Sequence, residues 1–148
     1  MAGVNFSDKV AGNWEAGLDG LAKKLKNNVA RAGAQAMAQA VYDDAKRLAP
    51  ISEGPHVFHG THAKYEFNAG TLRASIYQVY SQDRSTGERK EYHVSWNHQK
   101  CPYGFMVEFG TSRAPAHPFL WPAYEQNRAR LVQLAAAAMA GKLSEIGT

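Results

Sequence analysis

The sequence predicts an α+β domain in which a long N-terminal helix, an antiparallel curled sheet of three to four strands and a C-terminal helix packed on that sheet follow one another. Three observations predict this order. Apolar residues recur at helical spacing in the first third of the chain, residues 92–96 alternate as in a strand, and helical spacing returns after residue 119. With 148 residues, the chain is expected to form a single domain over 1–148 with its own buried core.

The N-terminal helix is predicted from leucine, valine and alanine residues that recur on one stripe as far as Leu48. Pro50 is expected to end it, because a proline disfavours helical geometry at the residue before it, here Ala49. Asn27 and Asn28 leave two alternatives open, one continuous helix or two helices with a break between them. The part after this point alone would form a rod about 30 Å long.

Residues 51–69 are predicted to form a long inserted loop, with a short strand near Tyr65–Phe67. The segment contains Gly54, Pro55 and Gly60 and has no steady period. Loops of this length are uncommon inside compact domains and are often functional, so this loop is a candidate for contact with a partner.

The strands of the sheet are expected at Leu72–Tyr80, Glu91–Asn97 and Tyr103–Phe109. Ser81–Glu88 carries a turn composition and is predicted to connect the first two strands as a hairpin. In the third strand the aromatic residues and Val107 would face the core, and Glu108 would lie on the opposite face.

The last helix is predicted from Phe119 to Lys142, with Pro122 tolerated in its first turn and Gly141 as a stop signal near its end. The loop before it, Gly110–Pro118, contains two prolines that prevent it from joining either a ladder or a helix.

Charge and cysteine content restrict the function only weakly. Lys plus Arg number 17 against 13 Asp plus Glu, a net charge of +4 that permits contact with DNA or an acidic protein without requiring it. Arg84, Arg89 and Lys90 would form a basic hairpin tip, suited at most to sequence-independent phosphate contact. The lone Cys101 excludes an intramolecular disulfide and fits a reducing cytoplasm. The apolar stretch Leu131–Ala140 is too short to span a membrane.

Three segments carry a resemblance to a known family. They are Asp-Ala-Lys-Arg-Leu-Ala-Pro ending at Pro50, Gly-Thr-Leu-Arg-Ala-Ser-Ile beginning at Gly70, and Val-Glu-Phe-Gly-Thr-Ser followed by Pro-Ala-His-Pro-Phe over residues 107–119. In this order and spacing, over about residues 29–124, the chain resembles the head–tail joining or tail-completion proteins of long-tailed double-stranded-DNA phages. One departure is the insertion of residues 51–69 between the first two segments, which the family pattern places within a few residues of each other.

The resemblance implies a structural virion protein at the head–tail junction, assembled in the host cytoplasm as a homo-oligomeric ring of six-fold or twelve-fold symmetry. Its partners would be the head connector or adaptor and the tail tube or terminator, with the genomic DNA close by. It implies the same α+β architecture, no catalysis, no cofactor and no membrane. A ring that only caps the tail tube, a tail terminator, is the alternative within the same class.

The subunit or partner interface is predicted around the third segment. Glu108 is either an anchor for Arg113, for His117 or for a basic group of a neighbouring subunit, or a solvated carboxylate of little energetic value. Because prolines reduce the entropy lost on binding, the loop that ends in an aromatic pair favours an interface over a mere connection. The predicted interface residues are Glu108, Arg113, Pro115, His117, Pro118, Phe119 and Trp121.

Two patterns suggest other classes of function. His56, His59 and His62 have the residue type of a zinc site, and a small metal-dependent enzyme is the second hypothesis, although their spacing does not converge on one helix face. Cys101 with His98 resembles a nucleophile and base, but sequence proximity supplies neither a lowered thiol pKa nor an oriented base. A nonspecific DNA-binding domain is a third hypothesis, with no recognition fingerprint to support it.

Overall fold

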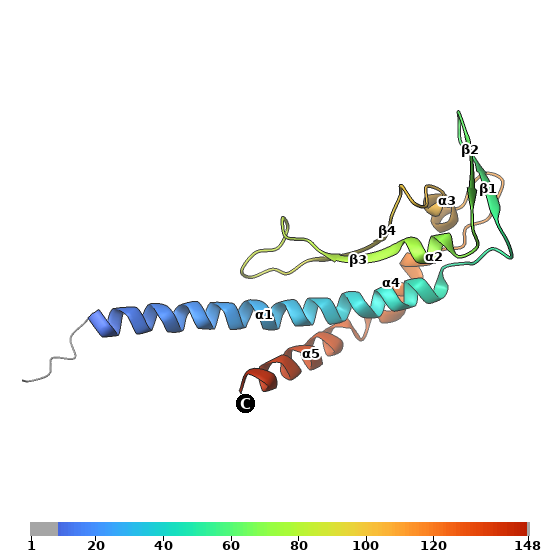
Figure 1. The fold of residues 1–148 in the computed structure, drawn as a ribbon. Helices are drawn as coiled ribbons and strands as arrows, with labels where there is room; N and C mark the ends of the chain where they lie inside the picture. Colours follow the sequence, from blue (N-terminus) through green and yellow to red (C-terminus); the bar gives the residue numbers. More distant parts are fainter. Residues whose placement is uncertain (1–8, 148) are drawn as a thin grey trace, which may run out of the picture.

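The computed structural model describes residues 9–147, with side chains from residue 16 onward, and the predicted α+β class is confirmed. The ends of the predicted domain, residues 1–8 and 148, lie outside the described part. Figure 1 shows the order of the elements, which are α1 (Lys9–Leu48), β1 (His56–His59), β2 (Lys64–Phe67), α2 (Thr71–Ser75), β3 (Ile76–Tyr80), β4 (Tyr92–Trp96), α3 (Gly104–Phe109), α4 (Leu120–Arg128) and α5 (Leu131–Ile146).

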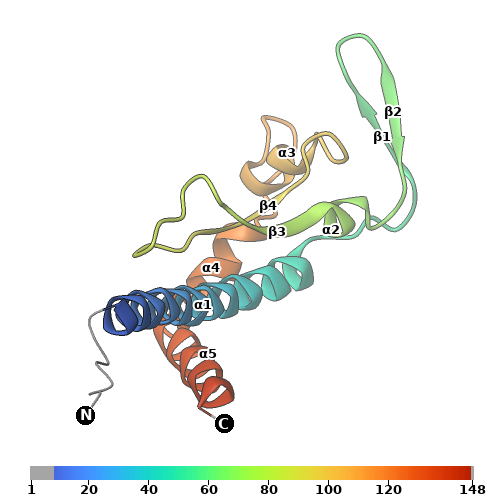
Figure 2. The same cartoon turned by 60° about the vertical axis from the view of Figure 1, so that its left-hand side comes forward.

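Helix α1 is the central element. It is a single helix of 40 residues, about 60 Å long, so of the two alternatives left open at Asn27–Asn28 the continuous helix is the one that forms. Its end at Leu48 confirms the stop predicted from Pro50. Strands β3 and β4 and helices α4 and α5 all contact it, and Figure 2 shows the strands above α1 and α5 below it. The C-terminal helices therefore pack mainly on α1, whereas the sequence analysis expected them on the sheet.

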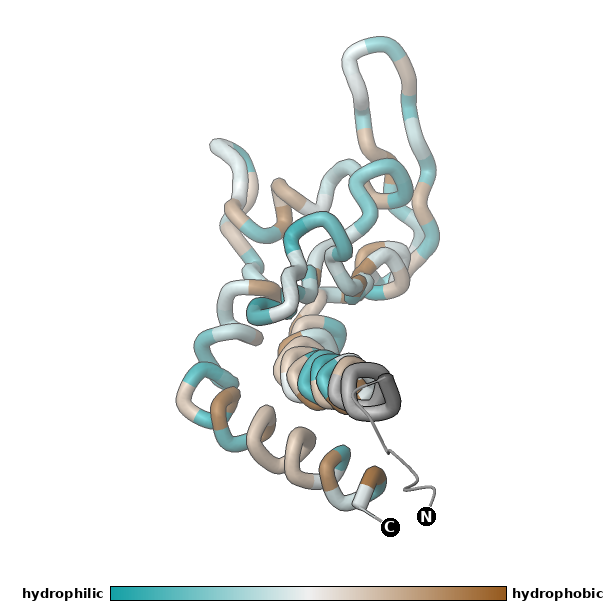
Figure 3. Tube along the Cα trace, turned by 90° about the vertical axis from the view of Figure 1, so that its left-hand side faces the viewer, coloured by the Kyte–Doolittle hydropathy of each residue, from teal (hydrophilic) through white to brown (hydrophobic). Residues whose placement is uncertain are grey.

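Small residues bring α1 and α5 close together. Gly33 is buried, and a side chain at this position would overlap Met139 of α5. Ala34 and Ala38 of α1 and Ala135 of α5 are also buried, so the two helix backbones approach without large side chains between them. Figure 3 shows that hydrophobic residues cover most of α5 where it lies beside α1. No helix in residues 9–147 is both long and apolar enough to cross a membrane.

The strands form two separate two-stranded antiparallel sheets in place of one sheet of three to four strands. In the β3–β4 sheet Ile76 pairs with Trp96 and Tyr80 with Tyr92, which confirms the predicted hairpin and its second strand, one residue shorter at each end than expected. The segment predicted as a loop, residues 51–69, contains the β1–β2 hairpin, which stands away from the helices (Figure 2). Its second strand confirms the short strand expected near Tyr65–Phe67.

One predicted strand is confirmed only in its second half, and another is wrong. The Leu72–Tyr80 segment begins as α2, because Gly70 takes a left-handed φ of 81° that starts the helix, and only Ile76–Tyr80 is extended. The Tyr103–Phe109 segment is α3, in which Gly104 and Glu108 lie one turn apart on the buried side. Phe105 and Phe109 lie four residues apart, a spacing that fits one face of a helix as well as one face of a strand. In the structure this face is exposed, whereas the strand prediction had placed it in the core.

The predicted last helix is divided at Asn127, which is fully buried. The Asn127 amide donates to the Ala123 carbonyl and accepts a hydrogen bond from Arg130 Nε at 2.8 Å, and its own carbonyl accepts from the Arg130 backbone N–H. These bonds end α4, and α5 begins at Leu131. Gly141 does not stop α5, which continues to Ile146.

The core lies where the C-terminal end of α1 meets α2, β4 and α4. It is built from Ala45, Ala49, Leu72, Ile76, Trp96, Cys101, Phe119 and Ala123. Arg73 of α2 closes this end of α1: its guanidinium donates to the carbonyls of Arg47 at 3.3 Å and Ala49 at 3.0 Å. These carbonyls have no partner within the helix, so a cation satisfies both their bonding and the negative end of the helix dipole.

Asp44 joins α1 to the α4–α5 junction. Its carboxylate accepts from Asn127 Nδ2 at 2.6 Å and lies 3.2 Å from Arg47 and 3.9 Å from Arg130. The hydrogen bond from Asn127, and then the two arginines, hold the pKa of Asp44 below its ordinary value, although partial burial acts in the opposite direction. The contact therefore contributes more to the stability of the fold when Asp44 is ionised.

We expect this contact to make the fold more stable above the unfolded-state pKa of aspartate, about 3.9, and to lose that contribution as the pH falls through the lower folded-state pKa. Asp44→Asn should therefore lower the urea midpoint at pH 7, and its difference from the wild type should shrink at pH 3. Asp43→Asn, an exposed neighbour on the same helix, should keep the pH response of the wild type. An Asp44→Asn deficit that is unchanged from pH 7 to pH 3 contradicts this assignment.

The contact between Gly104 and Trp96 gives a second prediction. A side chain at 104 would overlap the buried Trp96 indole, so Gly104→Ala should lower the free energy of unfolding by about 1–3 kcal/mol. Gly141→Ala is the matched control, because nothing lies within 4 Å of a side chain there. That change should raise stability by up to about 1 kcal/mol. Urea unfolding followed by circular dichroism compares the two, and equal stability of Gly104→Ala and the wild type would rule out the predicted overlap.

Candidate protein-interaction surface

Glu108 holds the N-terminus of α4. Its carboxylate accepts hydrogen bonds from three backbone N–H groups, those of Phe119 at 2.8 Å, Leu120 at 3.0 Å and Trp121 at 3.0 Å. These groups lack partners within the helix, and a negative charge is favoured at this end of the helix dipole. No side chain of α4's own cap residue supplies this bonding. Glu108 of α3 therefore caps the N-terminus of a different helix, α4.

This contact corrects the expectation for Glu108. The side chain is only 5% exposed, so a solvated carboxylate is wrong. Among the described contacts, its oxygens are bonded to backbone N–H groups of α4 and not to Arg113 or His117. Glu108 instead holds the start of α4, and with it the exposed residues of the predicted interface, in position from the buried side.

The loop between α3 and α4 is ordered by its own hydrogen bonds. Gly110 has a φ of 76°, which favours glycine, and a side chain there would crowd the backbone of Ala116. The Thr111 hydroxyl accepts from the backbone N–H groups of Arg113 and Ala114, and the His117 N–H donates to the Val107 carbonyl at 2.8 Å. We name residues 108–121 the α3–α4 clasp. Its loop is held in one shape before any partner binds.

The predicted interface residues divide into two groups. Phe119 is fully buried in the core and Glu108 is buried beneath the clasp. The others, Arg113, Pro115, His117, Pro118 and Trp121, are exposed. The structure therefore presents five of the predicted residues to solvent and uses the remaining two to position them.

The clasp borders an apolar groove that the sequence analysis did not predict. The groove has a volume of about 730 Å³ and lies between α1, the β3–β4 hairpin and α4. Trp121, which is 64% exposed, and Phe109, which is 65% exposed, lie on its edge with Tyr124. Ala34, Met37, Ala38 and Val41 of α1 line its inner side, with Tyr92, Val94, Trp96, Leu120 and Leu131. We name this the aromatic groove.

Exposed aromatic side chains of this kind mark surfaces that bind other proteins. The Phe105 and Phe109 rings lie 4.8 Å apart, and those of Trp121 and Tyr124 lie 5.7 Å apart, so the rings pack in pairs. Sequence reasoning missed Phe105, Phe109 and Tyr124 because it placed the first two inside a strand. The spacing of four residues between Gly104 and Glu108 was the available signal, since it equally fits one buried helix face.

The structure does not bring the three histidines of the hairpin together. His56 packs edge to face on Tyr103 with ring centroids 4.8 Å apart, and its Nδ1 lies 3.2 Å from the Ser52 hydroxyl. His59 and His62 are exposed, and strand alternation places His59 on the opposite face of the hairpin from His56. Over residues 9–147, no group of three or more His, Cys, Asp or Glu side chains is placed to hold a metal ion.

Cys101 lacks the environment of a nucleophile. It is fully buried, and this burial raises the pKa of its thiol. Its hydrogen-bond partners are Tyr103 and Ser75, whereas the His98 ring stacks on Trp96 with centroids 4.6 Å apart. The cysteine and histidine that are close in sequence therefore have different neighbours, and a thiol of raised pKa has little thiolate at neutral pH.

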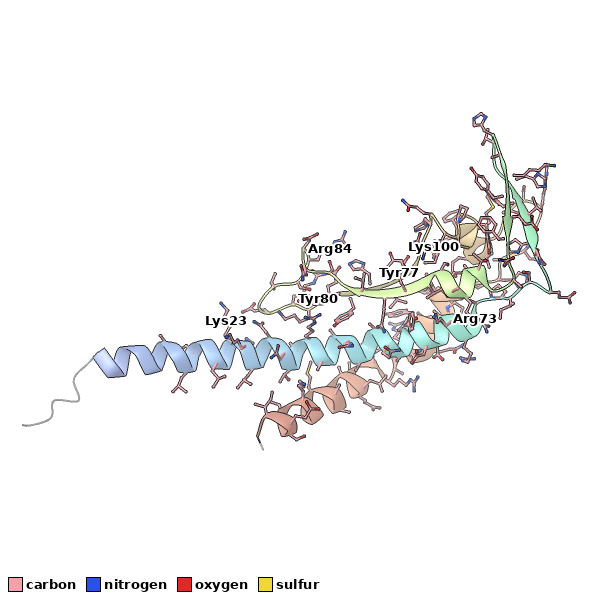
Figure 4. The ribbon with its side chains drawn as sticks, viewed as in Figure 1. Lys23, Arg73, Tyr77, Tyr80, Arg84 and Lys100 are labelled. Carbon is pink, nitrogen blue, oxygen red and sulfur yellow. The ribbon has the colours of Figure 1, made fainter. Side chains whose placement is uncertain are left out.

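The basic hairpin tip is only partly neutralised within the described part of the chain, because one carboxylate serves two arginines. Glu91 lies 3.6 Å from Arg84 and also pairs with Arg89, and Lys90 donates to the Thr86 carbonyl. Figure 4 shows that basic residues are spread along the molecule, with Lys23 and Arg73 toward opposite ends of α1. This arrangement gives no continuous track of positive charge for a nucleic-acid backbone.

Comparison of the chain with models of protein families, with curated proteins and with solved structures finds no match. The geometry defines a small α+β domain in which an ordered loop and exposed aromatic side chains border an apolar groove.

Removal of the Glu108 carboxylate tests the clasp. Glu108→Ala leaves three N–H groups without their partner, and we expect it to lower the free energy of unfolding by at least about 2 kcal/mol, the upper end for a lost helix cap. Glu108→Gln keeps one acceptor oxygen and should lose less. Glu53→Ala, at an exposed position, should change stability by no more than about 0.5 kcal/mol. Chemical denaturation measures all three, and a Glu108→Ala loss no larger than that of Glu53→Ala would refute the cap.

Proposed function

We propose that this chain is a structural protein of a phage virion that forms a homo-oligomeric ring at the head–tail junction and joins or completes the tail. The proposal rests on the resemblance carried by residues 44–50, 70–76 and 107–119, and one structural observation supports it. The third segment lies in the clasp, whose buried members are Glu108 and Phe119. These two hold the exposed residues of the clasp in place, and one of them, Trp121, lines the apolar groove.

A protein that assembles into a ring needs surfaces whose shape exists before assembly, because ordering a loop on binding reduces affinity. The clasp meets this requirement through the bonds at Gly110, Thr111 and His117. The projecting parts of the fold fit the same task. The β1–β2 hairpin and the N-terminal part of α1 both extend away from the core, where they can reach a neighbouring subunit or another neck protein (Figure 1).

The ring would have six-fold or twelve-fold symmetry, as the resemblance implies, with the head connector or adaptor on one side and the tail tube or terminator on the other. A tail terminator that only caps the tube is the second candidate of the same class. The β1–β2 hairpin favours the joining role, because its exposed strand edges and its position outside the core suit contact with a second protein.

Inactivation of the gene in the genome that encodes this chain tests the proposal. We expect filled heads and separate tails that fail to join, with infectious particles restored when the wild-type protein is supplied from a plasmid. Antibody-gold electron microscopy of the restored particles should place label at the junction of head and tail. Tails of uncontrolled length would instead favour the terminator.

The control is the same plasmid with Val132→Glu, an exposed change on α5 that lies outside the clasp and the groove, which should restore particles as the wild type does. Intact infectious particles from the inactivated genome, together with absence of the protein from wild-type virions by mass spectrometry, would remove the virion role.

A further inference from the structure

The N-terminal part of α1 has an apolar face that the described part of the chain covers only in part, since Leu18 and Leu21 are exposed and Leu25 is half-buried. Figure 1 shows this part of α1 extending past both the tip of the β3–β4 hairpin and the C-terminal end of α5. Leu18 is 49% exposed and Leu21 is 53% exposed. With Leu25 they stand at i, i+3 and i+7, so they lie on one side of the helix. We name residues 16–26 the projecting segment.

The projecting segment is poorly suited to be helical without a packing surface. Gly17 and Gly20 have nothing within 4 Å of a side-chain position, and each lowers helix stability by about 1 kcal/mol relative to alanine. Helices of this length gain most of their stability from the burial of an apolar face. The leucine face of the segment therefore needs a surface that the described part of its own chain does not provide.

The aromatic groove has the complementary shape and chemistry. It is open, it is lined mainly by apolar side chains, and it is long enough to touch α1, the hairpin and both C-terminal helices. An amphipathic helix that lays residues i, i+3 and i+7 into an apolar groove is a recurrent mode of protein recognition. Met37 and Val41 form the floor of the groove, and Trp121 and Tyr124 form one wall.

One acidic side chain beside the groove can pair with the lysines of the projecting segment. Lys24 and Lys26 precede and follow Leu25, so they flank the leucine face at about 100° on either side. Glu125 lies one turn after Trp121, on the same side of α4, and its described ion pair with Arg128 is long, at 3.8 Å. On the hairpin wall, Arg89 is paired with Glu91 and Lys90 donates to the Thr86 carbonyl, so the acidic partner for the lysines of the segment lies on the α4 side.

We propose that the projecting segment of one copy of this chain docks its Leu18–Leu21–Leu25 face in the aromatic groove of a second copy. The segment and the groove are different surfaces, so the contact is heterologous and each copy both gives a segment and receives one. Contacts of this type form rings when the rotation between copies closes. The inference names the subunit contact of the proposed ring and rests on that proposed function.

The first test is the oligomeric state of the full chain, measured by light scattering after gel filtration. The wild type should form species larger than a dimer in a concentration-dependent manner, and Leu18→Glu with Leu21→Glu should leave only monomer. Leu143→Glu is the matched control, since Leu143 is 57% exposed on α5 and does not line the groove. It should assemble as the wild type does, and circular dichroism checks that each variant is folded. Equal assembly of the double variant and the control overturns the proposal.

The second test fixes the geometry of the contact. Leu21→Cys combined with Tyr124→Cys should give a disulfide-linked ladder beyond the dimer under oxidation, both in purified protein and in lysates where heads and tails join. The native Cys101 is buried and should not contribute. Dimers from Leu21→Cys alone would show that two α1 helices pair with each other and would overturn the proposal.

Absence of the ladder in both settings would also overturn it. In that case, antibody label at the head–tail junction would leave the proposed function standing. Conversely, a ladder from a protein that is absent from virions would retain the contact and remove the virion role. The two failures are therefore distinguishable.

Discussion

The hydrogen bonds from the N-terminus of α4 to the Glu108 carboxylate are the interaction on which the rest of the structure depends. They join α3 to α4, close the loop between them and bring Phe119 into the core. A buried carboxylate is unfavourable unless its oxygens are satisfied, and here the donors belong to a helix end that itself needs an acceptor. The N–H groups of α4 therefore satisfy the buried carboxylate, and the carboxylate satisfies the N–H groups. The positions of the exposed clasp residues depend on this contact.

The other two segments of the sequence pattern act on helix ends in the same way. Arg73 bonds to the last carbonyls of α1, and Asp44 bonds to Asn127 where α4 gives way to α5. Each of the three segments thus contributes one charged side chain that fixes a helix terminus. This explains in physical terms why they occur in one chain: together they set the relative positions of α1, α2, α3 and α4 around a small core.

Sequence reasoning succeeded where one local signal dominates. Pro50 ended α1 because of its own geometry, and Tyr92–Trp96 alternated cleanly enough to give β4. It failed where long-range contacts decided the outcome. The α3 segment has an alternation that fits a strand, but it forms a helix whose buried residues, Gly104 and Glu108, contact Trp96 and the N-terminus of α4. The division between α4 and α5 depends on the contacts of Asn127 with Asp44 and Arg130, which no local pattern reveals. The exposed residues of the clasp were predicted, whereas the groove was not, because it lies between elements far apart in sequence.

Because α1 is one continuous helix, the distance to which its projecting segment extends and the direction in which its leucine face points are linked. In a flexible chain these two properties would be independent. Each residue of an α-helix adds about 1.5 Å of length and turns the following face by about 100°. Deletion of three residues between the body and the tip would thus shorten the arm by about 4.5 Å and rotate its leucine face by about 300°. Any insertion or deletion in α1 therefore changes both its length and the direction in which its leucine face points. The shape of the protein is accordingly more sensitive to insertions and deletions in this helix than to most substitutions on its exposed surface.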